Sequence, residues 1–102
     1  MVMILSALNG CASRPVPAVD QRLIALGQER GASAEQLRRG RELLVTACAY
    51  CHTPVYPTSI SMERWDKALP RMIEKAQLHA ADEADIRAYI IAARATEGGS
   101  SH

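Results

Sequence analysis

The chain has 102 residues, a mass of 11.1 kDa and a formal net charge of +1, from 12 Lys and Arg against 11 Asp and Glu. This length allows one small domain and excludes multidomain enzymes. The balanced charge argues against nucleic-acid binding, which needs a strong basic excess on one face. Apolar residues make up 48% of the chain, but 17 of them are alanine and none is phenylalanine. Alanine buries little area, so a core with few bulky side chains contributes little stability. The composition therefore predicts that an additional group in the core or a covalent cross-link stabilises the domain.

The N-terminus is an uncharged apolar run, MVMILSAL, followed by Asn9, Gly10 and Cys11. The run is far shorter than the ~20 residues that span a bilayer and resembles the end of a secretory signal peptide. The sequence LNGC at 8–11 resembles the lipobox of bacterial lipoproteins, in which the cysteine becomes the first residue and carries a lipid. This resemblance implies a signal-peptide remnant over 1–10 and a lipid anchor at Cys11. The alternative is an ordinary free cysteine behind a frayed apolar end.

The segment 11–18 contains Pro15 and Pro17 and is predicted to be an extended, lipid-anchored tether. The folded domain is predicted over 19–97, and 98–102 is predicted to be a flexible tail. Apolar residues at helical spacing predict four helices in the domain, and no stretch alternates like a strand. The fold class is therefore predicted to be all-α.

The first two helices lie before the central cysteines. The first begins near Val19, and two glycines, Gly27 and Gly31, weaken and end it. The second begins after Ser33, whose spacing to Gln36 is typical of a capping box, and is predicted to run to about Cys48.

The last two helices follow a proline-rich loop. The third is capped by Ser61, and Pro70 is predicted to kink or split it because proline removes a backbone donor. The fourth begins near Ala80, with acidic residues in its first turns that suit the helix dipole. It is predicted to bury one apolar face made of Ile86, Tyr89, Ile90 and Ala93.

The sequence CAYCH at 48–52 is a CxxCH haem-attachment motif. Cys48 and Cys51 can form thioethers with the two vinyl groups of one porphyrin, and the adjacent imidazole of His52 can bind the iron. The motif therefore predicts one covalent haem c.

Three other interpretations of these residues are possible. A zinc site would need a fourth ligand, for which His79, His102 or an acidic residue is present. A thioredoxin-like dithiol would follow a strand, and none is predicted. The remaining alternative is a structural disulfide between Cys48 and Cys51.

Residues 33–95 resemble the class I c-type cytochromes. In that family a glycine and a large apolar residue precede the first haem cysteine by eight and four positions, and Gly40 and Leu44 match them. The glycine allows a close crossing with the C-terminal helix, and an aromatic residue, here Tyr89, packs into the crossing. The resemblance implies a cytochrome c-like fold of three to four helices wrapped around one covalent haem.

The sixth iron ligand decides what such a haem does. The family usually supplies a downstream methionine, and the resemblance points to Met72, 20 residues after His52 and shortly before the last helix. Met62, ten residues after His52, is the first alternative, followed by His79 or no protein ligand. A thioether opposite imidazole favours Fe(II) and raises the reduction potential. Met72 can also simply fill the apolar face of its helix.

Several further residues can support the haem or its partners. Tyr56 and Trp65 are candidates for a hydrogen bond to a propionate, and core or rim packing is an equal alternative. Arg38, Arg39 and Arg41 can steer an acidic redox partner, although a solvated helix face is the simpler interpretation.

These features predict a single-electron carrier on the periplasmic side of the bacterial envelope, anchored to a membrane through Cys11. Its partners are expected to be a protein electron donor and a protein acceptor. No paired carboxylates or nucleophile–base pair accompany the motif, so catalysis by the chain alone is not expected. The alternatives are a haem-based ligand binder or sensor with an open sixth position, and a haem subunit docked to a dehydrogenase or oxidase.

Overall fold

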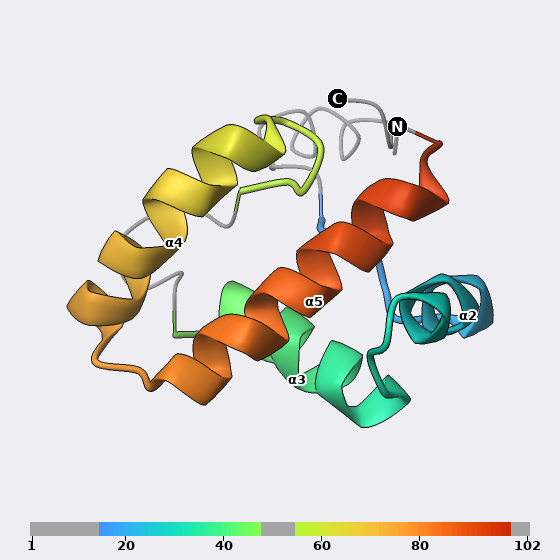
Figure 1. Ribbon diagram of the computed structural model, residues 1–102, viewed down its shortest axis with the longest axis horizontal. Coiled ribbons are helices and arrows are strands. Elements are labelled where there is room, and N and C mark those ends of the chain that lie inside the picture. The colour runs from blue at the N-terminus through green and yellow to red at the C-terminus, as the bar shows by residue number, and fades with distance from the viewer. Residues whose placement is uncertain (1–14, 48–54, 99–102) are drawn as a thin grey trace, which may run out of the picture.

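The computed structural model describes residues 15–47 and 55–98, and each regular element in these ranges is an α-helix. This confirms the all-α prediction for the described residues. In chain order the helices are α2 (Gln21–Glu29), α3 (Ala34–Val45), α4 (Met62–Ala76) and α5 (Ala80–Thr96). Figure 1 shows α5 running across the centre, with α4 on one side of it and α3 on the other.

Two of the helices begin with the caps that the sequence predicts. The Ser33 hydroxyl accepts a hydrogen bond from the backbone N–H of Gln36 at 3.1 Å, and the Ser61 hydroxyl accepts one from Arg64 at 3.2 Å. Each bond satisfies an N–H that has no partner within its own helix. The starts of α3 and α4 are therefore fixed by local chemistry.

The end of α3 differs from the prediction. The helix stops at Val45, three residues before Cys48, which lies outside the described residues. The hydroxyl of Thr46 donates to the carbonyl of Glu42 at 2.6 Å. Such a side-chain bond competes with regular helix geometry and often bends or ends a helix.

Of the two effects predicted for Pro70, a split of the third helix is wrong, and a kink stays a prediction. A single helix, α4, continues through Pro70 to Ala76. Pro70 cannot donate to the carbonyl of Asp66, but both residues are exposed, so water can bond that carbonyl. The apolar face that the proline would interrupt remains intact.

The core lies where the other three helices pack on α5. Its largest buried side chains come from each described helix, as the spacing of apolar residues predicts. They are Leu23, Leu37, Leu44, Trp65, Leu69, Ile86, Tyr89 and Ile90. None of the helices in the described ranges is long and apolar enough to cross a membrane.

Two helices that share α5 as a neighbour do not bring their backbones close to each other. Both α3 and α4 are described throughout and pack on α5, yet no Cα atom of α3 lies within 8 Å of one of α4. Figure 1 shows them diverging from α5 on opposite sides. The chain that connects them, 46–61, includes the predicted haem motif.

Candidate functional site

The predicted haem motif at 48–52 and the predicted lipid site at Cys11 lie outside the described residues. The roles of Cys48, Cys51 and His52 therefore stay predictions. The structure does show what precedes and follows the motif: α3 with the two residues after it, Thr46 and Ala47, and the segment from Val55 that leads into α4.

The helix that precedes the motif crosses α5 closely at Gly40. A Cβ added to Gly40 would lie 2.0 Å from the carbonyl oxygen of Asp85 and 3.0 Å from the Cβ of Tyr89. A contact of 2.0 Å with backbone cannot be relieved by rotating a side chain, so one helix would have to move. The predicted close crossing at Gly40, with Tyr89 packed into it, is confirmed.

The phenol of Tyr89 is held at this crossing by the N-terminal segment. Its hydroxyl donates to the carbonyl of Pro17 at 2.5 Å, and burial raises the pKa of Tyr89 above its ordinary value. Arg41 donates from Nε to the same carbonyl at 2.9 Å and from Nη2 to the carbonyl of Val16 at 3.2 Å. Val16 is itself part of the core. Two residues that the sequence assigned to the tether thus pack against the folded helices.

An ion-pair cluster joins α3 to the start of α5. The guanidinium of Arg39 lies 2.8 Å from Asp82 and 3.3 Å from Asp85. Asp82 also accepts the backbone N–H of His79 at 3.0 Å. That N–H, and next the bond from Arg39, hold the pKa of Asp82 below its usual value. The bond to Asp82 in turn raises the pKa of Arg39.

These contacts change how the three arginines of α3 are interpreted. Arg39 and Arg41 are both engaged with other parts of the chain, so they are more than a solvated face. Arg38 is exposed. Of the three, Arg38 is therefore the simplest candidate for contact with a partner protein.

The candidates for the sixth iron ligand occupy three different positions. Met72 lies inside α4, four residues before the end of the helix, and Met62 is the first residue of the same helix. Both are half-buried and pack against the core. His79 is exposed and precedes α5, with its backbone N–H bonded to Asp82.

The polar groups of Trp65 and Tyr56 both have partners within the protein. Trp65 is fully buried, and its Nε1–H donates to the carbonyl of Pro57 at 3.0 Å. The Tyr56 hydroxyl donates to Glu97 at 2.6 Å. Core packing therefore describes Trp65 in this structure, and a bond to a propionate would require a different arrangement.

Arg94 is a residue that the sequence analysis missed. It is only 5% exposed and donates from Nη1 to the carbonyls of Pro57 at 3.0 Å and Ile60 at 2.7 Å. With Trp65 it fixes the segment that follows the motif. Its position was detectable, because it lies eight residues after Ile86, on the apolar stripe of α5.

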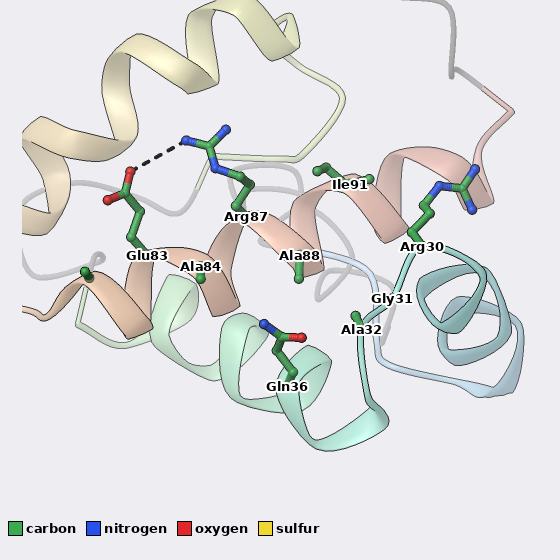
Figure 2. A pocket seen from close by; sticks show the side chains of 10 residues that line it. Arg30, Gly31, Ala32, Gln36, Glu83, Ala84, Arg87, Ala88 and Ile91 are labelled. Atoms are coloured by element: carbon green, nitrogen blue, oxygen red, sulfur yellow. Dashed lines mark ion pairs between the residues drawn. The ribbon is translucent and has the colours of Figure 1, made fainter.

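A surface hollow of about 430 Å³ lies where the turn between α2 and α3 faces α5. Figure 2 shows that Arg87 reaches toward Glu83 in one part of the hollow's lining. Arg30 lies in another part of the lining. Neither methionine candidate lines this hollow, and neither does His79. The hollow is therefore separate from the candidate ligands.

The comparisons with known proteins add no family to this description, since no family model, curated protein or solved structure matches the chain. Any function must therefore be argued from the motif and from the described helices around it. Within the described ranges, no three His, Cys, Asp or Glu side chains gather as a group that could hold a metal ion. The motif itself is not among those residues.

Proposed function

We propose that this chain is a monohaem c-type cytochrome with a cytochrome c-like fold that carries single electrons in the bacterial envelope. The observation that carries the proposal is the pairing of the CxxCH motif with the close crossing at Gly40. The motif predicts covalent haem from the chemistry of its thiols and imidazole. The crossing is a packing feature eight residues earlier, observed independently of the motif.

The arrangement of α3 and α4 supports the same proposal. Their Cα atoms stay more than 8 Å apart, although both helices pack on α5. Several apolar side chains near the two ends of the motif segment, on α4 or just after α4 keep some exposed surface. These include Leu43, Val45, Val55, Met72 and Leu78. A haem held by the motif would cover apolar surface of this kind in a chain that lacks bulky core residues.

Each residue of the site has a distinct part in the proposal. Cys48 and Cys51 would hold the porphyrin through thioethers, and His52 and Met72 would bind its iron. When bound, the haem provides a one-electron change between Fe(III) and Fe(II). The chain's apolar residues would exclude water from the iron, and the thioether would favour the reduced state. Electron exchange then needs only brief, small contacts with partner proteins.

We place the protein on the periplasmic side of the envelope, with a lipid on Cys11. Covalent haem attachment and a lipobox-like LNGC sequence both point to an exported protein. An acylated N-terminus with two or three chains gives stable membrane binding where a single chain does not.

The first test is whether the haem is covalent. The mass of the purified, denatured protein should include one haem, and the Cys48→Ala/Cys51→Ala variant should lack it. A wild-type protein exported from cells competent in haem attachment that carries no haem mass would overturn the proposal.

The second test concerns the sixth ligand. Reduced wild-type protein should not bind carbon monoxide readily, whereas Met72→Ala should bind it and should lose the spectrum of a six-coordinate thioether-ligated haem. Met62→Ala is the matched control, since Met62 is also half-buried on α4, and its spectrum should be unchanged. Ready binding of carbon monoxide by the wild type would instead support a ligand binder or sensor.

A further inference from the structure

The N-terminal segment is fastened to the helix crossing. We call residues 16–18 the N-terminal strap. Val16 is 5% exposed and belongs to the core. Three hydrogen bonds reach the strap's backbone carbonyls: one from Tyr89 and two from Arg41. The donors come from both helices of the crossing, so the strap is bound to α3 and α5 together.

The chemistry of the strap favours this docked state. Bonds from a guanidinium to a carbonyl are charge-assisted and stronger than neutral ones. Pro15 and Pro17 fix two φ angles and so reduce the entropy that the segment loses on docking. The strap is therefore a fixed part of the domain rather than a flexible leader.

Docking of the strap shortens the path to the lipid. This step depends on the proposed function, in which Cys11 carries the anchor. From Cys11 to Val16 a fully extended chain spans about 16–18 Å, whereas from Cys11 to Asp20, at the start of α2, it would span about 30–32 Å. A domain of about 80 residues has a radius of gyration of about 12 Å and hence a diameter of about 30 Å. The docked strap thus leaves a tether shorter than the domain is wide.

We propose that the docked strap, together with the lipid anchor, fixes the orientation of the domain on the membrane. One face of the domain then lies against the bilayer. This face is the surface around the strap, where Pro15, Ala18, Asp20, Gln21 and Arg22 are exposed. The strap and the start of α2 share a hollow with Thr96 at the end of α5, so the same face includes that end of the central helix. The partner it contacts is the phospholipid headgroup layer.

The charges on this face indicate whether electrostatic attraction holds it against the bilayer. It presents Asp20 and Arg22, one acid and one base. Such a face is neither strongly attracted to nor repelled by anionic headgroups. The short tether, and not charge, therefore sets the orientation, which should be insensitive to salt.

The experiment uses the full lipidated, haem-loaded protein in phosphatidylcholine vesicles that contain a fluorescent headgroup acceptor. A donor dye is placed on Glu35→Cys, an exposed position at the start of α3. In the proposed protein the other three cysteines are occupied by haem and lipid, so only this thiol reacts. Energy transfer then reports the distance from the domain to the bilayer.

Two independent variants release the strap. Arg41→Gln/Tyr89→Phe removes the three hydrogen bonds, and Val16→Asp places a charge at a buried position. Each should lengthen the available tether by about 13–14 Å, the span of four residues, and should broaden and lengthen the measured distance. Arg38→Gln, which changes an exposed arginine on the same helix, should leave the distance unchanged. Raising the salt concentration should also leave it unchanged.

Backbone order parameters from NMR relaxation at the Val16 and Ala18 amides show whether the strap is docked, with or without the lipid. Order parameters typical of flexible backbone there in the lipidated wild type would overturn the orienting role alone, since the acyl mass on Cys11 would still be present. An unchanged distance after the strap is released would overturn it too. Absence of acyl mass on Cys11 would overturn both the proposed anchor and the orientation.

Discussion

The carbonyl oxygen of Asp85 lies 2.0 Å from the position that a Cβ on Gly40 would take. Glycine in the interior of a helix costs about 1 kcal/mol relative to alanine. The presence of glycine at position 40 is therefore explained by the close crossing of α3 with α5. It is not explained by helix propensity within α3, which would favour alanine. The same backbone contact distinguishes it from Gly27, whose added Cβ would meet the flexible end of Leu37 at 2.5 Å.

Gly40→Ala should destabilise the protein. Overpacking against fixed backbone costs about 3 kcal/mol, and the better helix propensity of alanine returns about 1 kcal/mol. The expected loss in the free energy of unfolding is thus about 2 kcal/mol, measured by urea denaturation. Gly27→Ala is the comparison, because its added Cβ would meet only side-chain atoms of Leu37 and no backbone, so it should lose less stability than Gly40→Ala. Equal stability of the two variants would contradict a close crossing.

Arg94→Met should destabilise the protein by about 3 kcal/mol, because it leaves buried carbonyls without their charged donor. The carbonyl of Ile60 would lose its bond, while that of Pro57 would keep the one from Trp65. Urea denaturation measures the loss. Arg94→Lys, which keeps the charge and one donor, should recover part of it, and Arg22→Met, at an exposed position, should change little. A stable Arg94→Met would show that the segment 55–61 does not depend on this arginine.

Much of the fold could be predicted because apolar spacing and caps act locally. Ser33 and Ser61 marked two helix starts, and the four residues predicted for the buried face of the last helix are all fully buried. The split predicted at Pro70 does not occur, because the effect of a proline depends on which face it occupies, and Pro70 lies on the exposed one. Arg94 was missed because an arginine is normally exposed, and only the segment folded over it makes burial possible.

Like the fold, the candidate site could be predicted from the sequence only in part. The close crossing could be predicted because a glycine inside a helix costs about 1 kcal/mol relative to alanine, so Gly40 indicates a packing requirement, and the resemblance supplied Tyr89 as its neighbour. The bonds from Arg41 and Tyr89 to Pro17 could not, because they join residues far apart in sequence through a backbone carbonyl that has no sequence signal. The sixth ligand stays a prediction for a similar reason, since sequence spacing alone does not say where a thioether points.

The link between α3 and α5 through Asp82 should weaken in acid. Because its bonds hold the pKa of Asp82 below its usual value, the folded state gains stability from the ionised carboxylate above the unfolded pKa of about 3.9. This gain is lost as the pH falls below about 3.9 and through the lower pKa of the folded state. Asp82→Asn should therefore be less stable than the wild type at pH 7, and the difference should shrink below about pH 3.9. Urea midpoints measured from pH 2.5 to 7 check this, with the exposed Glu74→Gln as control. A difference that stays constant over that range would contradict the prediction.

Removal of the proposed haem should leave the chain largely unfolded or molten. The described core contains one tryptophan, one tyrosine, one valine and a few Leu and Ile side chains, with alanine elsewhere, and no Cα atom of α3 lies within 8 Å of one of α4. A group that binds only the folded chain stabilises it, so its loss removes that stabilisation. The Cys48→Ala/Cys51→Ala variant should keep part of its helical far-ultraviolet signal but lose the near-ultraviolet signal and cooperative unfolding. Gly27→Ala, expressed in the same way and retaining its haem, provides the comparison. Cooperative unfolding of the haem-free variant at the wild-type midpoint would show that α2, α3, α4 and α5 need no cofactor in their core.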